Sequence, residues 1–359
     1  MIFCTLFDSN YLDKGLVLYK SLVNNVKDFK LYILAMDYKC FQVFEDLNYS
    51  EVVPISLERF MQVEKLQEIK EKRSVAEFCW TCTPHLIDYV FEQYGENICT
   101  YIDSDLCFYA DCACLIEEMG ERDVQIVEHR FTKKIEDQIA QKESGKYCVE
   151  FNTFKNTSKG RKLLEWWKER CRESCSAIAY DGKVFGDQKY LEEWEENEDV
   201  AVLRNLGGGV APWNVAQYRM TRNEKDGTYI CLENKETKEK FKLIFYHFHN
   251  ITYKSLREVD ISVYQRAWGV DDSLIKAIYI PYLLQLNDMK EMLSSKYGIN
   301  SLIQIHPSFE GRERKRKGIK DLYNSVRKNG IKGMYILLYL NINGVLRKRF
   351  KEKKNHISF

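Results

Sequence analysis

Short apolar runs of strand length alternate with longer segments of helical periodicity along the first 260 residues. The apolar runs are MIFCTLF (1–7), KLYILAM (30–36), EVVPISL (51–57), ICTYIDSDLCFY (98–109), VQIVEHRF (124–131) and FKLIFYHFHN (241–250). Apolar residues at helical spacing lie between them, in 14–26, 57–72, 80–94, 160–173 and a segment that opens after Asp187. Strands that alternate with helices form βαβ units, so the pattern predicts an α/β fold with a mostly parallel sheet and helices on both faces.

The chain is long enough for one large domain with appendages. Its 359 residues are 45% hydrophobic and 13% aromatic, which is the composition of a globular protein. We expect an α/β domain over 1–265, a helical extension packed on that domain over 266–310, and a basic amphipathic tail over 311–359.

The tail differs from the rest of the chain in charge. Residues 311–359 contain 15 Lys and Arg against 3 Asp and Glu, whereas the preceding residues contain 39 against 50. A basic amphipathic segment suits the anionic inner face of a membrane, so we expect peripheral membrane association, with a solvated charged terminus as the alternative. The tail lacks an aromatic and basic binding module, which argues against a nucleic-acid partner.

The N-terminal residues and the cysteines indicate a compartment. MIFCTLFDSNY lacks the basic start and the small-residue cleavage site of a signal peptide, and no apolar run reaches the roughly 18 residues of a membrane span. A chain of this length has its own hydrophobic core and does not need disulfides for stability, so the 12 cysteines do not indicate a disulfide framework. We therefore expect reduced, structural cysteines and a cytoplasmic protein.

Polar residues follow several of the predicted strands at their carboxyl ends. Asp8, Asp103, His247 and His249 hold such positions, and open α/β sheets bind ligands beyond these ends. In a strand Asp103 and Asp105 would point to one face, and two adjacent carboxylates suit a hard cation such as Mg²⁺ or Mn²⁺. A pair of solvated acids at a turn is the alternative reading.

The late strand supplies two candidate imidazole ligands. Its alternation places Phe245, His247 and His249 on one face. A single histidine on a strand is more often a core residue, but two on one face at a strand end favour a metal site. An Asp/Asp/His ligand set favours Mn²⁺ over Mg²⁺. Which histidine would bind the metal stays open.

Several motifs occur in the order found in one enzyme family. They are Asp8-Ser9-Asn10-Tyr11, Ser21-Leu22, Asp103-Ser104-Asp105, Phe151-Asn152, Asp187-Gln188, Trp213-Asn214 and a late histidine. Over residues 1–260 the chain resembles GT-A-fold, nucleotide-sugar-dependent glycosyltransferases, in particular the glycogenin-like and lipopolysaccharide galactosyltransferase family. It also resembles a bacterial branch of such transferases found with surface-polysaccharide genes. The resemblance implies a GT-A catalytic domain over 1–265.

The resemblance also implies roles for individual residues. The donor-binding residues would be Asp8, Asn10, Tyr11, Arg73, Asp103 and Asn152, with Arg73 on the diphosphate. The metal ligands would be Asp103, Asp105 and either His249 or His247. Asp187 and Gln188 would be catalytic residues lining the sugar pocket, and Trp213 and Asn214 would lie in the acceptor and sugar pocket.

The chain departs from the family after the late histidine. The family continues H-x-x-G-x-x-K-P-W, with a lysine on the diphosphate, whereas this chain reads HFHNITYKSL. The Gly and the Pro-Trp are missing, and Lys254 comes five residues after His249 rather than six. The family's phosphate-binding lysine is therefore not assigned to Lys254.

The expected function is transfer of a hexose from a UDP sugar to a glycan or lipid-linked acceptor during surface polysaccharide synthesis. The family retains the anomeric configuration; an inverting enzyme would need a carboxylate base, for which Asp187 is the candidate. The alternatives are an inactive GT-A scaffold of a polysaccharide assembly complex and a nucleotidyltransferase. A glycoside hydrolase could also use two carboxylates, about 5–10 Å apart and without a metal.

Overall fold

The computed structural model of the protein describes residues 1–177, 184–221, 230–255, 258–261, 270–300 and 356–358. The chain divides into two compact units, one of Met1–His249 with Ala267–Ser301 and one of Asn250–Arg266 with Leu302–Phe359. The first unit contains the elements of the predicted α/β domain and the long helix that follows it.

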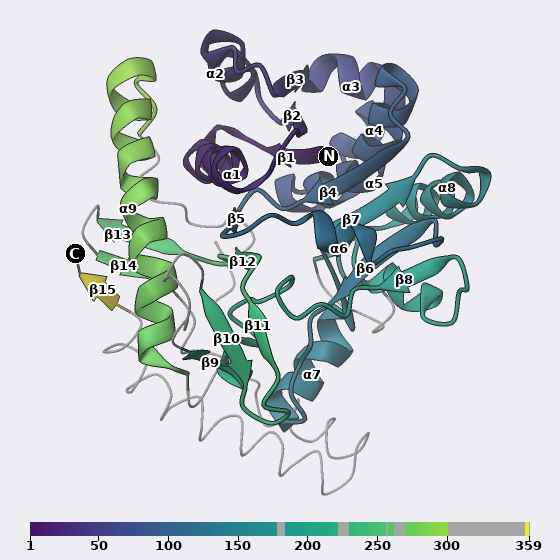
Figure 1. Ribbon diagram of the computed structural model, residues 1–359. Coiled ribbons are helices and arrows are strands. Elements are labelled where there is room, and N and C mark those ends of the chain that lie inside the picture. Colours follow the sequence, from purple (N-terminus) through teal and green to yellow (C-terminus); the bar gives the residue numbers. More distant parts are fainter. Residues whose placement is uncertain (178–183, 222–229, 256–257, 262–269, 301–355, 359) are drawn as a thin grey trace, which may run out of the picture. The chain divides into compact units, whose positions relative to one another are not determined.

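A seven-stranded sheet forms the centre of the first unit (Figure 1). Its strand order is β3 (Val52–Ser56), β2 (Lys30–Ala35), β1 (Ile2–Phe7), β4 (Ile98–Ile102), β7 (Tyr147–Lys155), β6 (Val124–Glu128) and β8 (Val200–Val202). All neighbouring pairs are parallel except those that β7 makes with β4 and β6. The prediction of a Rossmann-like, mostly parallel sheet is confirmed.

Helices connect these strands. The α-helices before β8 are α1 (Leu12–Asn25), α2 (Tyr38–Leu47), α3 (Leu57–Glu64), α4 (Gln67–Lys70), α5 (Val75–Tyr94), α6 (Ala113–Glu117), α7 (Ile135–Ser144) and α8 (Ser158–Glu173). Short 3-10 helices are η1 (Ser9–Tyr11), η2 (Lys189–Trp194) and η3 (Val215–Gln217). The helix expected after Asp187 is thus a 3-10 helix, η2.

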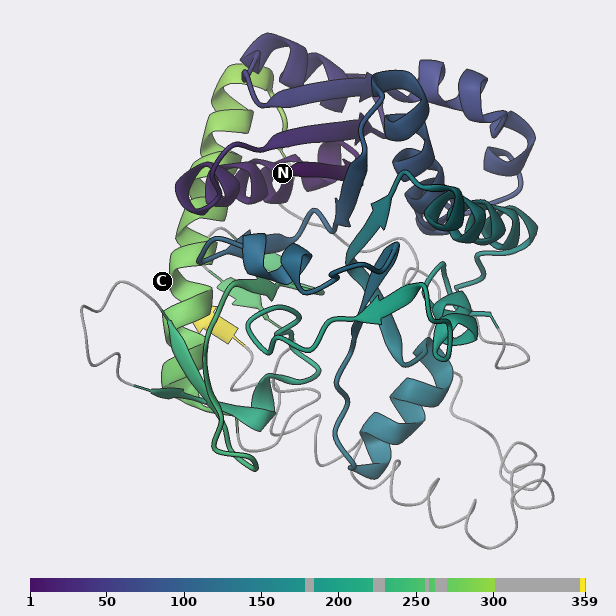
Figure 2. The same ribbon diagram turned by 45° about the vertical axis from the view of Figure 1, so that its right-hand side comes forward.

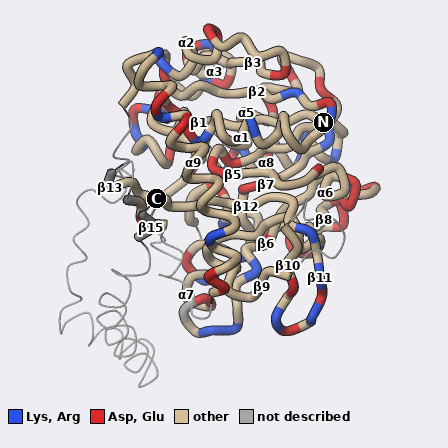
Figure 3. The backbone as a smooth tube through the Cα atoms, turned by 60° about the vertical axis from the view of Figure 1, so that its left-hand side comes forward, with Lys and Arg blue, Asp and Glu red and all other residues tan. Residues whose placement is uncertain are grey.

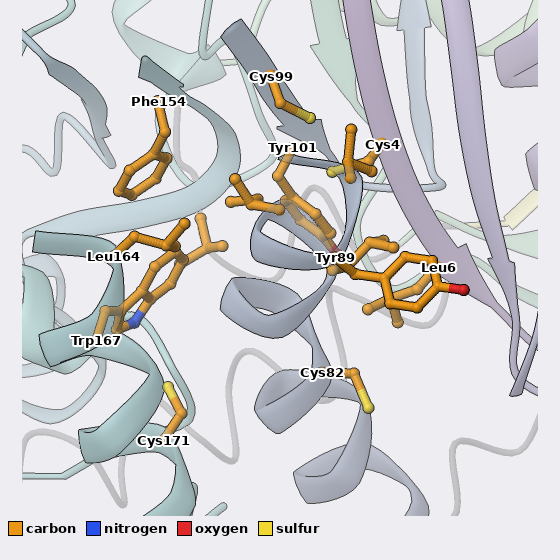
Figure 4. Packing of buried hydrophobic residues seen from close by; sticks show 14 of the residues in the cluster. Cys4, Leu6, Cys82, Tyr89, Cys99, Tyr101, Phe154, Leu164, Trp167 and Cys171 are labelled. Atoms are coloured by element: carbon orange, nitrogen blue, oxygen red, sulfur yellow. The ribbon is translucent and has the colours of Figure 1, made fainter. Parts of the chain in front are cut away.

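The alternation of side chains along β1 shows that helices cover both faces of the sheet. Cys4 and Leu6 belong to a buried cluster with residues of α5 and α8, whose neighbouring members are shown in Figure 4. Phe7 points to the opposite face, where its ring lies so close to Gly15 of α1 that a Cβ there would be 2.2 Å from it. Glycine at this position therefore lets α1 pack directly on β1.

Local signals in the sequence explain where the main helices begin. Ser74 accepts a hydrogen bond from the backbone of Glu77, and the Glu77 side chain bonds back to Ser74, so a capping box starts α5. Thr157 caps α8 through the backbone N–H of Gly160. Gly95, in the left-handed region, ends α5.

Small sheets and a long helix complete the first unit. The strands are β5 (Leu106–Phe108) with β12 (Phe245–His247), and the meander of β9 (Tyr218–Thr221), β10 (Cys231–Asn234) and β11 (Lys240–Lys242). Helix α9 (Asp272–Tyr297) packs against α1, as Figure 2 also shows. Acidic and basic positions alternate along the β10–β11 hairpin (Figure 3).

The second unit has three short described strands, β13 (Thr252–Ser255), β14 (Glu258–Asp260) and β15 (His356–Ser358), and β14 pairs with both others. Apart from β15, the expected basic tail lies outside the described residues. The expected division into 1–265, 266–310 and 311–359 stays a prediction. Within the described part of the chain, no helix combines the length and apolarity of a membrane span.

Candidate active site

The two aspartates of the D-S-D motif lie in the turn between β4 and β5. The Asp103 N–H donates to the backbone carbonyl of Glu150 at 3.1 Å, and the Leu106 N–H donates to the Asp103 carbonyl at 3.2 Å. The expectation that both acids stand on one face of a continuous strand is wrong in this detail. A turn forms here because the chain leaves β7, the partner of β4, and pairs with β12 through β5.

The turn nevertheless directs both carboxylates at one histidine. The Nε2 atom of His247 lies 3.0 Å from Oδ1 of Asp105 and 3.7 Å from Oδ2 of Asp103. The antiparallel pairing of His247 with Leu106 brings the end of β12 to the turn. The side chain of His247 is 4% exposed and that of Asp105 is 12% exposed, whereas Asp103 is 31% exposed and reaches solvent.

These groups fit a divalent cation. Ligand atoms of Asp105, His247 and His249 lie within 4.8 Å of one another, so one ion could reach all three. Adjacent ligands of an octahedral ion bound at about 2.1 Å are separated by about 3.0 Å, which matches the spacing between Asp105 and His247. Two carboxylates and imidazole nitrogen form a ligand set that suits Mn²⁺.

The two histidines differ in their surroundings. His247 is buried, whereas His249 is exposed and follows the end of β12. The indole of Trp213 packs on both imidazoles, with ring centroids 5.2 Å from His247 and 5.8 Å from His249. Trp213, expected in the acceptor and sugar pocket, is 6% exposed and therefore forms part of the wall behind the histidines.

Glu150 is a buried carboxylate at this site that the sequence analysis missed. Its Oε2 lies 2.6 Å from Nδ1 of His247, and its side chain is fully buried. The available signal was an acid inside the otherwise buried strand YCVEFNTFK, two residues before Asn152. A charged residue in a central strand is rare unless it has a partner.

The electrostatics of the cluster follow from burial and mutual proximity. Burial acts to raise the pKa of Asp105, but His247 and Lys14 hold that pKa well below its usual range. Burial acts to lower the pKa of His247, but the carboxylates of Asp105 and Glu150 raise it. Burial, with the nearby Asp105 carboxylate, raises the pKa of Asp103. The cluster thus holds an imidazolium where a cation would bind.

The D-S-N-Y turn forms η1 directly after β1. Asp8 accepts hydrogen bonds from the backbone and side-chain nitrogens of Asn10, both at 3.0 Å. Asn10 is exposed, and Tyr11 is partly buried. Burial and the charge of Asp105 raise the pKa of Tyr11 above its usual range, which places this tyrosine near the D-S-D turn.

Lys14 is a second residue that the sequence analysis missed. Its side chain is 2% exposed, and its Nζ lies 4.0 Å from the ring centroid of Tyr11. Burial lowers the pKa of Lys14, and the Asp105 carboxylate counteracts this effect most strongly. A lysine in the first turns of the helix after D-S-N-Y was the available signal, but nothing in the sequence showed that it would be buried.

Asp187 and Gln188 precede η2 and differ in orientation. The Asp187 side chain is 4% exposed; burial and the Asp103 carboxylate raise its pKa to about 7. The structure therefore brings Asp187 near the D-S-D turn. The amide of Gln188 donates to the backbone carbonyl of Ser144 at 2.6 Å.

Two other predicted site residues hold neighbouring segments in place. The guanidinium of Arg73 donates to the backbone carbonyls of Cys171 and Arg172, both at 2.6 Å, at the C-terminal end of α8. Asn214 is fully buried and donates to the carbonyls of His129 and Gly209 at 3.0 and 2.7 Å. These bonds hold Arg73 and Asn214 in framework positions, and we leave both out of the proposed site.

Asn152 is fully buried in β7, opposite Tyr101 of β4. The Tyr101 hydroxyl donates to Oδ1 of Asp103 at 3.1 Å, so this strand pair supports the D-S-D turn from below. The side chain of Lys254 lies outside the described part of the chain.

Comparison with known proteins identifies the family. No protein-family model matches the chain. The uncharacterized protein YfnF of Bacillus subtilis (strain 168) is 34% identical over 266 residues, which cover 72% of this chain and 84% of YfnF. The chain belongs to the same family as YfnF. The uncharacterized protein YfnD of the same organism is 27% identical over 298 residues, covering 82% of this chain and 91% of YfnD.

Solved structures with a similar fold include glycosyltransferases. Galactosyltransferase LgtC, in complex with donor and acceptor sugar analogs, has a TM-score of 0.45 and 13% identity, covering 70% of this chain and 87% of LgtC. GlyE of Streptococcus pneumoniae TIGR4 has a TM-score of 0.37 and 16% identity, covering 56% of this chain and 45% of GlyE, so the chain matches less than half of GlyE. At this level of similarity, the functional argument rests on the residues of the site.

Proposed function

We propose that this protein is a metal-dependent glycosyltransferase that moves a hexose from a UDP sugar to a glycan or lipid-linked acceptor in surface polysaccharide synthesis. The observation that carries the proposal is the convergence of Asp103, Asp105 and His247 on one point beyond the sheet's strand ends. The D-S-N-Y turn follows β1, the strand next to β4, so a nucleotide at that turn would direct its phosphates toward the same point.

Asp103, Asp105 and His247 would hold Mn²⁺ or Mg²⁺. When bound, the cation supplies positive charge that stabilises the departing nucleoside diphosphate. Asp105 would be the main carboxylate ligand because it is less exposed and nearer to Nε2 of His247 than Asp103 is. The more exposed Asp103 can also contact the donor.

Asp8, Asn10 and Tyr11 would bind the base and ribose of the donor. Asp8 orients Asn10 through two hydrogen bonds, which leaves the exposed Asn10 amide in one position. Lys14 supplies a buried ammonium beside Tyr11 and near Asp105, where it can attract a phosphate oxygen. Lys14 would thus bind the diphosphate, the role that the family gives to a lysine after the late histidine and that is not assigned to Lys254 in this chain.

Transfer breaks the bond between the anomeric carbon and the diphosphate oxygen and forms a bond to an acceptor hydroxyl. In the retaining reaction that we propose, the leaving phosphate oxygen takes the proton of that hydroxyl. Asp187, buried near Asp103, would contact the sugar, and Gln188 and Trp213 would border the pocket. In an inverting reaction, Asp187 would instead accept the proton as a base, since its pKa is raised to about 7.

The basic tail is the proposed contact with an anionic membrane, where a lipid-linked acceptor would be held. Deletion of the tail would also remove β15, which pairs with β14. Replacement of its basic clusters by glutamine in the full chain is therefore the cleaner test. Co-sedimentation with vesicles rich in phosphatidylglycerol should be lost; retained sedimentation would contradict a membrane role for the tail.

The central experiment measures binding and hydrolysis of nucleotide sugars by the purified protein with and without Mn²⁺. A ligand that binds only the native state raises its melting temperature by mass action. We expect one UDP sugar to stabilise the protein in Mn²⁺ and to be hydrolysed slowly. Asp105→Ala should remove the metal-dependent part, whereas Asp199→Asn, which removes a surface ion pair with Lys159, should not.

The same assay separates the rival functions. An inactive scaffold would turn over no nucleotide sugar although it is folded. A nucleotidyltransferase would form a nucleotide sugar from a nucleoside triphosphate and a sugar phosphate, releasing diphosphate. A glycoside hydrolase would act without a nucleotide sugar or a metal.

A further inference from the structure

We infer that Glu150 is a positioning residue that selects His247, rather than His249, as the imidazole ligand of the cation. This inference rests on the proposed metal site and names how its third ligand is chosen. Although Cys148, Glu150 and His247 also place ligand atoms within 4.8 Å of one another, we assign Glu150 no contact with the donor or the cation; it acts through the orientation of the His247 ring.

The pairing of β7 with its neighbour β6 is irregular at Glu150. The pairing of β6 with β7 shifts from Gln125 opposite Thr153 to Val127 opposite Cys148. Four residues of β7, 149–152, thus lie opposite a single residue of β6, Ile126, and Glu150 is one of the four. Irregular pairing of this kind often occurs next to functional sites, and here it accompanies the contact of Glu150 with His247.

The hydrogen bond to Glu150 determines which nitrogen of His247 faces the aspartates. With Nδ1–H donated to Glu150 at 2.6 Å, Nε2 is directed at Asp105. A carboxylate that accepts the distal N–H of a histidine ligand fixes its ring orientation and tautomer and raises its basicity as a ligand. His249 is exposed, although its ligand atom lies within 4.8 Å of those of Asp105 and His247, and the carboxylate contact of Glu150 is with His247.

The surroundings of Glu150 leave it little freedom to move. An added Cβ on Gly209 would lie 3.2 Å from Oε1 of Glu150, so glycine at this position leaves room for the carboxylate. The Trp213 indole and the His247 imidazole form a T-shaped contact. The His247 ring is therefore held by its hydrogen bond to Glu150 and by its contact with the Trp213 indole.

The chain contains a second pair with the same geometry that serves as an internal control. Oε2 of Glu64 in α3 lies 2.6 Å from Nδ1 of His85 in α5, and these side chains are 6% and 0% exposed. This pair belongs to a helix interface and faces no candidate metal ligand set among the described residues. Loss of its carboxylate should affect stability in a similar way but should not affect metal binding.

The test compares Mn²⁺ binding to Glu150→Gln and Glu64→Gln in the full-length protein. Isothermal titration should show a dissociation constant raised about 10-fold or more by Glu150→Gln and changed less than about 2-fold by Glu64→Gln. Pulsed electron paramagnetic resonance of bound Mn²⁺ should show an imidazole nitrogen signal that His247→Gln removes and His249→Gln retains. In Glu150→Gln this signal should weaken.

Two results would overturn the inference. One is wild-type Mn²⁺ affinity and nitrogen signal in Glu150→Gln; the other is a signal lost in His249→Gln and kept in His247→Gln. If Glu150→Gln does not fold, Glu150→Asp keeps the charge but withdraws the carboxylate, and its affinity should also fall. Mn²⁺ bound through Asp105 without turnover of any nucleotide sugar would overturn the proposed function and leave the role of Glu150 intact, whereas absence of Mn²⁺ binding would overturn both.

Discussion

Lys290 of α9 forms an ion pair with Asp13 of α1, with Nζ 2.5 Å from Oδ2, and the two side chains are only 5% and 1% exposed. Asp13 lies two residues after Tyr11, so this ion pair links α9 directly to α1, the helix that follows the D-S-N-Y turn. Docking of α9 therefore supports the proposed nucleotide site.

Lys290→Met should destabilise the protein by about 3–5 kcal/mol, because it leaves the Asp13 carboxylate buried without its partner. Urea unfolding followed by circular dichroism measures this loss. Lys296→Met, on the same helix, breaks an ion pair with Asp46 whose members are 52% and 53% exposed, and because water screens such a pair the free energy of unfolding should change little. Equal effects of the two substitutions would contradict a structural role for the buried pair.

Much of the fold was predictable because its strands and helices are strongly periodic. The runs around β1, β2 and β4 are largely apolar and mostly buried, as expected for strands covered on both faces. The turn at Asp103 was not predictable from periodicity, because the apolar run continues on both sides of it. The chain turns there because β5 finds its partner in β12, about 140 residues later.

The candidate site was predictable where a motif carried it and unpredictable where tertiary packing made it. Asp105 and His247 could be named from strand-end positions, and the structure brings them together. The choice between His247 and His249 depends on burial and on Glu150, which lies where the pairing of β6 with β7 is irregular. Arg73 looked like a phosphate ligand from its position, but its guanidinium bonds the end of α8.

Lys14→Met should weaken binding of nucleoside diphosphates about 10- to 100-fold, because a charged contact with phosphate contributes about 1.5–3 kcal/mol. The nucleoside itself, which lacks phosphates, should bind unchanged. Titration calorimetry with UDP and uridine in Mn²⁺ measures both. Lys20→Met on the exposed side of the same helix is the matched control, and equal UDP affinity of the two variants would contradict a role for Lys14.

Glu64 and His85 should make stability depend on pH in an unusual way. Burial raises the pKa of Glu64 to about 7 from 4.5, against the pull of Lys168. Burial, with Arg172 and Lys168, holds the pKa of His85 well below 6.5. Between pH 4.5 and 6.5 the folded pair keeps one proton on Glu64, while the unfolded pair keeps one on His85. Folding then exchanges no net proton, and the contribution of the pair to stability is flat.

The contribution of the Glu64–His85 pair to stability should fall both below pH 4.5 and above pH 6.5. Below pH 4.5 the unfolded chain binds a second proton that the folded pair does not, so stability is lost as the pH falls. From pH 6.5 to about 7 the folded chain holds the extra proton, so stability is lost as the pH rises. Urea unfolding of wild type and Glu64→Gln/His85→Gln at several pH values measures the difference; a monotonic difference through pH 5 to 6 would contradict this account.

Asp187→Asn tests the stereochemical course. We expect retention, with the variant losing about 10- to 100-fold in turnover through a weakened contact with the sugar and forming the same anomer. Proton NMR of the first product formed reads the configuration. An inverted product, with wild-type activity that rises through about pH 7 and a variant without that rise, would show that Asp187 is the base.

Gly209→Ala should weaken Mn²⁺ binding from a position that touches no proposed ligand. Gly209 has φ of +80°, and an added Cβ would lie 3.0 Å from Cγ1 of Val127 and 3.2 Å from Oε1 of Glu150. The backbone strain of alanine there costs about 1–2 kcal/mol, and displacement of the carboxylate loosens the His247 ring.

Gly95→Ala is the matched control, because its φ of +70° brings the same strain while nothing lies within 4 Å of the new methyl group. Both variants should lose similar stability in urea, and only Gly209→Ala should lose Mn²⁺ affinity in titration calorimetry. A loss of affinity in both would trace the effect to general destabilisation, and wild-type affinity in Gly209→Ala would show that the Glu150 carboxylate tolerates the displacement.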